Sequence, residues 1–169
     1  LEVALSFNST ASGLQMLTVP ANPTAGVWPW RVISPELATQ ELTAGDLDRD
    51  GDLDLLLGTK WLRNDGGPWN LQTVNPSAGL PDRNRLVDIN QDGRLDSVVG
   101  FEVVSGLAKL VWYEQPVSPT DTWTEHLITN LIGPMSVDVA DLDHDGDVDI
   151  VVGDRVIEDG LHQHVAVHA

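Results

Sequence analysis

The chain has 169 residues, 41% hydrophobic and 21% charged, which is enough for one globular domain with a buried core. Its net charge of −17 argues against nucleic acid or an anionic membrane as a partner, and the absence of cysteine excludes disulfides and thiol chemistry. No apolar run is long enough to predict a membrane span. Fifteen glycines and ten prolines, without long helical patterns, favour an all-β fold.

The first 34 residues predict three short strands, at Leu1–Phe7, Gly13–Val19 and Trp28–Ile33. They line up with the second, third and fourth strands of the repeats that follow. We therefore expect residues 1–34 to form a partial unit that lacks a first strand. With no signal peptide ahead of Leu1, we also expect the chain to be processed or to be a piece of a longer protein.

Three nine-residue segments then share the pattern D-x-[DN]-x-D-G-x-[LV]-D. They are DLDRDGDLD (Asp46–Asp54), DINQDGRLD (Asp88–Asp96) and DLDHDGDVD (Asp141–Asp149), which we call loops 1, 2 and 3. Their starts lie 42 and 53 residues apart, the spacing of propeller blades or similar small repeats. Thirteen of the nineteen aspartates lie in these loops, so the acidity of the chain belongs mostly to local sites.

The flanks of the loops repeat as well. A brief apolar stretch precedes each loop, and an apolar run ending at Gly58, Gly100 or Gly153 follows it. Third strands are predicted at 60–65, 109–114 and 155–159, and fourth strands at 69–74, 123–128 and 162–167. The acidic loop would thus join the first strand of each repeat to the second.

Four antiparallel strands per repeat predict an all-β fold of β-propeller blades. The expected units are a partial blade at 1–34 and blades at 35–74, 75–128 and 129–169, about three and three-quarter blades in one propeller domain. Because an open propeller exposes blade faces and a strand edge, we expect self-association or the remainder of a larger propeller to complete it.

The loops place oxygen donors at positions 1, 3, 5 and 9 and a backbone carbonyl at position 7, around a glycine at position 6 that permits a sharp turn. This set predicts a Ca²⁺ site in each loop, about three ions per chain, because hard oxygen ligands without Cys or His favour Ca²⁺. The predicted ligands are Asp46, Asp48, Asp50, Asp52 and Asp54 in loop 1; Asp88, Asn90, Asp92, Arg94 and Asp96 in loop 2; and Asp141, Asp143, Asp145, Asp147 and Asp149 in loop 3.

An EF-hand would need an acidic residue at position 12 followed by a helix. Here position 12 is Leu57, Val99 or Val152, each within a strand-like run, which excludes an EF-hand. The alternative is a solvated acidic turn without metal. Among the three sites we expect loop 2 to be the weakest, because Asn90 replaces a carboxylate and Arg94 stands beside it.

The loops, the apolar run to glycine, and the segments Trp112–Glu114 (WYE) and Trp123–Ile128 (WTEHLI) resemble the FG-GAP/VCBS repeat family. This family comprises calcium-loop β-propellers such as those of integrin α-subunits and many secreted proteins. The resemblance covers nearly the whole chain. It implies structural Ca²⁺, an extracellular or cell-surface location, and a glycan or protein partner in binding or adhesion.

Other functional signals are weaker. His162, His164 and His168 alternate on a predicted outer strand, where a transition-metal site is the less favoured reading. Four tryptophans, Trp61, Trp69, Trp112 and Trp123, occupy equivalent positions in two repeats, which favours packing, whereas Trp28 and Trp30 are candidates for an exposed pair. The alternative function is part of a carbohydrate-active enzyme of the lyase or dehydratase type. It would need a catalytic His, Tyr or Lys in a central pocket, and Tyr113 is the single tyrosine.

Overall fold

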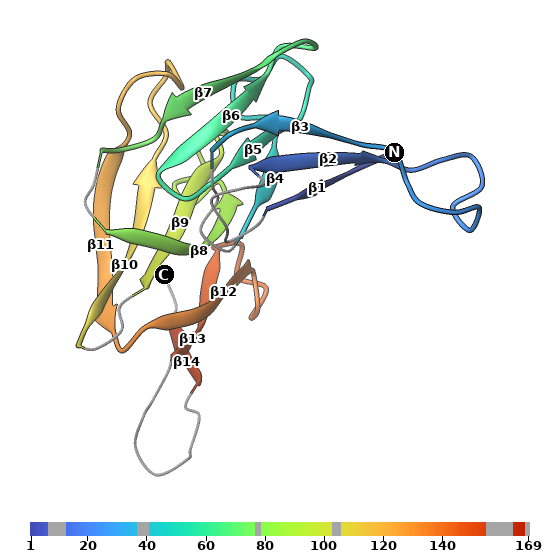
Figure 1. Ribbon diagram of the computed structural model, residues 1–169. Helices are drawn as coiled ribbons and strands as arrows, with labels where there is room; N and C mark the ends of the chain where they lie inside the picture. Colours follow the sequence, from blue (N-terminus) through green and yellow to red (C-terminus); the bar gives the residue numbers. More distant parts are fainter. Residues whose placement is uncertain (7–12, 37–40, 77–78, 103–105, 155–163, 168–169) are drawn as a thin grey trace.

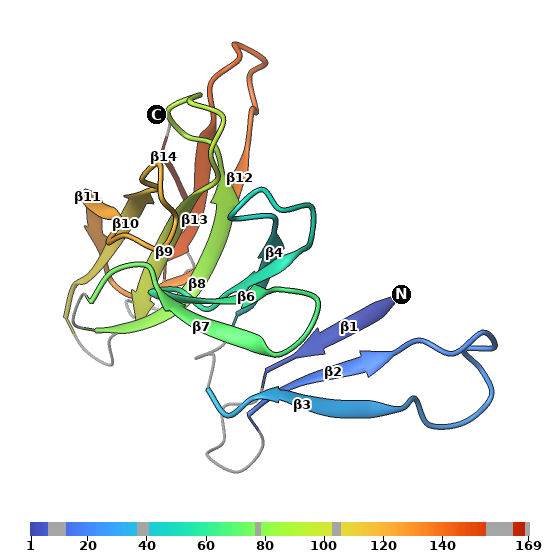
Figure 2. The ribbon, with the colours of Figure 1, turned by 90° about the horizontal axis from the view of Figure 1, so that it is seen from above.

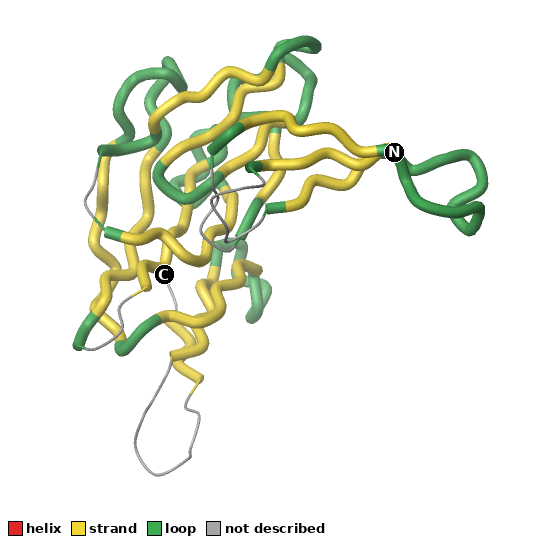
Figure 3. The backbone as a smooth tube through the Cα atoms, in the orientation of Figure 1, coloured by secondary structure: helices red, strands yellow, loops and turns green. Residues whose placement is uncertain are grey.

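The computed structural model describes residues 1–6, 13–36, 41–76, 79–102, 106–154 and 164–167, and for 154 and 164–167 it describes the backbone alone. These residues form fourteen strands, and no helix occurs among them, so the all-β prediction is confirmed (Figure 3). Within the same residues there is no helix long and apolar enough to cross a membrane.

The strands form four antiparallel sheets (Figure 1). The first sheet contains β1 (Glu2–Leu5), β2 (Leu14–Thr18) and β3 (Trp30–Ser34), and the second contains β4 (Thr43–Gly45), β5 (Asp54–Leu56), β6 (Lys60–Asn64) and β7 (Trp69–Thr73). The third contains β8 (Leu80–Val87), β9 (Asp96–Glu102), β10 (Ala108–Glu114) and β11 (Thr124–Leu131), and the fourth contains β12 (Pro134–Ala140), β13 (Asp149–Asp154) and β14 (His164–Val167).

The second and third sheets each have four strands paired in chain order, as propeller blades do. The acidic loops connect first strands to second strands, as the sequence indicates: β4 to β5, β8 to β9, and β12 to β13. Strands β4, β8 and β12 run in the same direction and end at these loops (Figure 2). Strand β8 contacts both β4 and β12, so the first strands lie side by side at the inner edge of the sheets. The number of blades and closure into a ring stay predictions.

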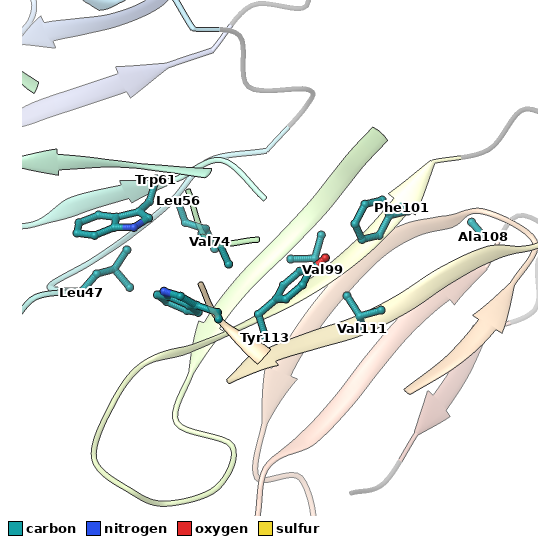
Figure 4. Close-up of a cluster of buried hydrophobic side chains, with 10 residues drawn as sticks. Leu47, Leu56, Trp61, Val74, Val99, Phe101, Ala108, Val111 and Tyr113 are labelled. Carbon is teal, nitrogen blue, oxygen red and sulfur yellow. The ribbon is translucent and has the colours of Figure 1, made fainter. Parts of the chain in front are cut away.

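Three hydrophobic layers hold the sheets together. Leu14 and Met16 of β2 meet Leu55 and Leu62 between the first and second sheets. A larger layer lies between the second and third sheets, and Figure 4 shows Trp61 and Leu56 on one side of it and Val99, Val111 and Tyr113 on the other. The third layer joins Val98 and Leu110 to Val137, Ile150 and Val152, between the third and fourth sheets.

The second strand of the second sheet shows why its sequence is apolar on both faces. Neighbouring side chains of a strand point to opposite faces. Leu55 therefore enters the layer shared with the first sheet, and Leu56 enters the layer shared with the third. Both are at most 5% exposed, and full burial of such a side chain contributes about 1.5 to 3 kcal/mol.

The last sheet differs from the sequence-based prediction in one respect. The segment 162–167 was expected to form a fourth, outer strand, but β14 pairs directly with β13, with Ile150 opposite Val167 and Val152 opposite Val165. It takes the third place in the sheet because an apolar strand can pair at any free strand edge in a suitable register. The third strand predicted at 155–159 lies outside the described residues.

Candidate metal centre: three acidic loops

The three loops have the same backbone conformation. Position 4 is left-handed in each, although its residue is not glycine: φ is 62° at Arg49, 57° at Gln91 and 64° at His144. Position 6 is also left-handed, with φ of 96° at Gly51, 82° at Gly93 and 98° at Gly146. A left-handed residue with a side chain is uncommon and costs energy, so its recurrence at position 4 marks a turn that the rest of the loop imposes.

Carboxylates accept backbone hydrogen bonds at matching places within each loop. The position 1 carboxylate accepts from the glycine N–H at position 6, at 3.1 Å for Asp46, 2.7 Å for Asp88 and 3.1 Å for Asp141. The position 5 carboxylate accepts from the N–H at position 7, at 2.9 Å in all three loops. These bonds curl the backbone so that the side chains at positions 1, 3 and 5 converge.

The convergence brings carboxylates together in two of the loops. In loop 1, oxygen atoms of Asp46, Asp48 and Asp50 lie within 4.8 Å of one another. In loop 3, oxygen atoms of Asp141, Asp143 and Asp149 do so. Such groupings of carboxylates repel each other unless a cation or a proton compensates the charge.

The position 9 aspartate has a structural role of its own, which the sequence did not indicate. Asp54 and Asp96 are fully buried. One oxygen of each accepts from the N–H at position 2, Leu47 at 2.9 Å and Ile89 at 3.0 Å. The other oxygen accepts from the end of the third strand, Asn64 N–H and Gln115 N–H, both at 2.9 Å. These aspartates therefore tether each loop to its own sheet.

Burial makes these two carboxylates harder to ionise. Desolvation raises the pKa of Asp54 and of Asp96 above the usual value, against the opposing effect of their two backbone hydrogen bonds. Neighbouring loop carboxylates raise both pKa values further, Asp48 and Asp50 in loop 1 and Asp92 and Asp88 in loop 2. In loop 3, Asp149 is 7% exposed and accepts from Leu142 N–H at 2.9 Å, as the other tethers do.

Loop 2 differs from loop 1 in its charges. The Arg94 guanidinium is paired with the carboxylate of Asp92. Desolvation raises the pKa of Asp92, but hydrogen bonds from Arg94 N–H and the Asn90 amide, together with the Arg94 charge, outweigh it and leave that pKa below the usual value. The Asn90 amide oxygen accepts from Asp92 N–H at 3.1 Å, as Asp48 does from Asp50 N–H at 3.3 Å.

Two contacts of position 3 were not predicted from the sequence. In loop 1, Arg63 Nε lies 2.6 Å from Asp48 Oδ2, as an ion pair whose angle does not make a hydrogen bond, so both buried atoms lack a hydrogen-bond partner. In loop 2, Asn90 Nδ2 donates to Glu114 Oε1 at 3.3 Å. Arg63 and Glu114 are equivalent, because each precedes the residue whose N–H binds the tether. That equivalence could be found by aligning the third strands on their ends.

Adjacent loops also touch each other. The position 4 side chain of one loop reaches the position 6 carbonyl of the next: Arg49 donates to Gly93 O, and Gln91 donates to Gly146 O at 3.3 Å and to Asp147 Oδ1 at 2.8 Å. Beneath them, the buried side chain of Gln115 donates to Leu47 O at 3.0 Å. The loops therefore form a connected row on one side of the molecule (Figure 2).

The donor set fits a hard divalent cation. The predicted ligands supply oxygen atoms alone, and the carboxylates of positions 1 and 3 converge in loops 1 and 3. Ca²⁺ accepts several carboxylate and carbonyl oxygens in flexible geometry, which suits loops 1 and 3. The ligand assignments at positions 7 and 9 stay predictions, as does the ion in loop 2. A bound ion would supply positive charge where the carboxylates converge.

The remaining candidate residues are buried or partly buried tryptophans, the exposed Trp30, and histidines whose side chains are not described. Trp61 and Trp123 are buried, whereas Trp69 and Trp112 are partly buried. Trp30 is 59% exposed, but the Trp28 indole is half-buried and donates to Pro23 O at 3.0 Å. His162 and His168 lie outside the described residues, and His164 belongs to β14, whose side chains are not described.

The comparisons with known proteins agree with this architecture. Residues 88–152 match the family model for FG-GAP-like repeats. The matched segment begins at the first residue of loop 2, runs through β9 to β12 and includes loop 3. No curated protein matches the chain. The predicted resemblance is thus confirmed for its FG-GAP part, since residues 88–152 are similar to FG-GAP-like repeats.

Proposed function

We propose that this chain is a calcium-binding β-propeller module whose three acidic loops hold structural Ca²⁺. The observation that carries the proposal is the shared geometry of the loops, which repeats the same left-handed residues and the same carboxylate hydrogen bonds three times. Three sequences that differ at positions 2, 3, 4, 7 and 8 adopt the same turn, and carboxylate oxygens converge in loops 1 and 3. A solvated acidic turn without a ligand gives no reason for this geometry to recur three times in one molecule.

The ions would act on stability rather than on catalysis. Each loop joins the two inner strands of its sheet, so an ion that binds the folded loop stabilises the folded state. At a free ion concentration 100 times the Kd, one such site adds about 2.7 kcal/mol to the free energy of unfolding. Extracellular calcium sites of this kind bind with Kd values of about 0.1 to 1 mM, which suits a location outside the cell.

The module would serve binding or adhesion, with a glycan or a protein as the partner. Trp30 supports this part of the proposal, because its exposed indole lies beside a hollow of about 140 Å³ lined by Met16, Thr18, Pro29 and Arg31. Exposed aromatic side chains of this type are frequent anchors in binding sites. Screening a panel of glycans in calcium tests the partner class, and loss of every signal in a Trp30→Ala variant is the expected result for this surface. A signal that persists in that variant would place the partner elsewhere.

Among the residues that the structure describes, the single tyrosine does not favour the enzyme alternative. Tyr113 is fully buried, and its hydroxyl donates to Glu125 Oε2 at 2.9 Å. Self-association fits better, since in the described part of the chain β1 pairs with β2 on one side alone and leaves its other edge open. We therefore include a second copy of the chain among the proposed partners.

Native mass spectrometry, in calcium and after chelation, tests the calcium proposal. We expect three ions per chain, and one fewer in each of the variants Asp46→Asn, Asp88→Asn and Asp141→Asn. Glu36→Gln is the matched control, because this acid pairs with Lys60 outside the loops. The same spectra count chains per particle. A folded chain that carries no calcium would contradict the proposal.

A further inference from the structure

The second loop has an acidic neighbour that is absent from the predicted ligand set. Glu114, the last residue of β10, accepts a hydrogen bond from the Asn90 amide at 3.3 Å. Asn90 occupies position 3, where loops 1 and 3 have Asp48 and Asp143. A carboxylate therefore lies next to the position at which loop 2 lacks one.

The equivalent neighbour in loop 1 has the opposite charge. Arg63 lies 2.6 Å from Asp48 Oδ2, and it stands at the same place in the third strand as Glu114. Loop 1 thus combines an acid with a base, and loop 2 combines an amide with an acid. Glu114 thus places beside loop 2 the negative charge that Asn90 lacks, whereas Arg63 beside loop 1 is shared between Asp48 and Asp65.

Formal charges show the extent of this compensation. The nine residues of loop 1, five aspartates and Arg49, carry −4, and Arg63 adds no net charge because it is also paired with Asp65 at 2.8 Å. The nine residues of loop 2, three aspartates and Arg94, carry −2, and Glu114 brings this to −3. By ligand type alone, loop 2 would be the weakest site. Glu114 halves the charge difference between the two loops.

Glu114 is held in place on its other side. Its Oε2 lies 2.9 Å from His126 Nε2, and the His126 ring stacks on Trp112, with ring centroids 4.3 Å apart and an angle of 15° between the planes. Trp112 in turn packs against the layer between the third and fourth sheets. A carboxylate fixed in this way loses little conformational freedom when the loop beside it binds a cation.

We propose that Glu114 completes the second acidic loop as a positioning residue, orienting Asn90 and supplying the negative charge that Asn90 lacks, so that loop 2 binds a divalent cation more strongly than its three ligand carboxylates alone would. This proposal rests on the proposed calcium function. It assigns to the third strand a part in cation binding that the loop pattern does not include.

The test is calorimetric titration of the intact chain with Ca²⁺, starting from chelated protein. The step that disappears in Asp88→Asn identifies loop 2. We expect Glu114→Gln to weaken that step about tenfold, the lower end of the range for residues that support metal ligands, because Glu114 is partly exposed. The other two steps should stay within about twofold of their wild-type affinities. Glu2→Gln removes the same charge in the first sheet and serves as the matched control.

A rescue variant separates this role from a purely structural one. In Asn90→Asp/Glu114→Gln the carboxylate moves back to position 3, and we expect the loop 2 step to recover to within about threefold of the wild type. A structural role of Glu114 would not predict recovery. Urea unfolding in chelator checks that the single and double variants fold alike, and the double variant alone still decides the question if Glu114→Gln does not fold.

The outcomes distinguish the two proposals. If the wild type binds no calcium, the proposed function fails. If the wild type binds three ions but Glu114→Gln leaves the loop 2 step unchanged, or weakens all three steps equally, then the calcium function stands and the role of Glu114 is wrong.

Discussion

Loops 1 and 2 reach one backbone geometry with different charges. Both contain the left-handed residues at positions 4 and 6 and the buried tether at position 9. Yet position 3 is an aspartate beside Arg63 in one loop and an asparagine beside Glu114 in the other. The hydrogen bonds within the loop fix its shape, and the side chains around it set its charge. The two properties can therefore vary independently.

Replacing the tether aspartates should cause the largest loss of unfolding free energy. The loss should be the same in loop 1 and in loop 2. In Asp54→Ala or Asp96→Ala, one buried and one partly buried N–H group lose their acceptor. We expect each variant to lose roughly 2 to 4 kcal/mol of unfolding free energy in urea titrations with chelator, because an unsatisfied buried donor costs about 1 to 3 kcal/mol and removal of a desolvated charge offsets part of that cost.

Asp50→Ala is the control for the tethers, since this exposed carboxylate accepts one bond within the loop and its loss should cost under about 1 kcal/mol. Measurement in chelator removes any contribution of ions. If the two tether variants differed by more than about 1.5 kcal/mol, the loops would not share one structural plan.

Replacing Gln115, whose hydrogen bonds join loops 1 and 2, should cause a smaller loss of unfolding free energy. Its buried side-chain amide donates to Leu47 O in loop 1, and its backbone carbonyl accepts from Arg94 Nε of loop 2 at 2.9 Å. Gln115→Met keeps the side-chain volume and the backbone bonds but leaves Leu47 O without this donor. We expect a loss of about 1 to 2 kcal/mol in the same titration.

Hydrogen exchange adds a spatial readout for Gln115→Met. The amide of Leu47, which donates to Asp54, should exchange faster in the variant, whereas protection in the first sheet should not change. Uniformly faster exchange throughout the chain would instead show a global loss of stability without a specific link between loops 1 and 2.

The sequence predicts the sheets and the loops because both depend on local patterns. Apolar runs such as Leu55–Leu57 specify strands, and the glycine at position 6 specifies a turn. The position of Trp61 in the core also follows from its repeat. Trp112 is equivalent and yet partly exposed, because burial depends on what the adjacent sheet supplies. That information is not present in the segment itself.

The environment of the loops could not be predicted for the same reason. Arg63 and Glu114 lie 15 and 24 residues from the position 3 residues that they contact, Asp48 and Asn90, and the two spacings differ because the hairpins differ in length. The two backbone N–H groups that donate to the position 9 aspartate could not be predicted either. One of them belongs to the third strand or its end, which reaches the loop only when the sheet forms. Long-range contacts of this kind have no fixed spacing in the sequence.

Loss of the contacts that position 4 makes with the next loop should reduce the unfolding free energy least. Arg49→Ala removes one surface hydrogen bond to the next loop, and Gln91→Ala removes two. We expect each variant to cost about 0.5 kcal/mol in unfolding free energy, since both side chains are exposed. His144→Ala is a matched control, because this residue has the same positive φ but no side-chain partner among the described residues. All three variants place alanine in the same left-handed conformation, so the strain cancels in the comparison. Losses in Arg49→Ala and Gln91→Ala that exceed the loss in His144→Ala would measure the contacts themselves; equal losses would mean that the loops touch without stabilising one another.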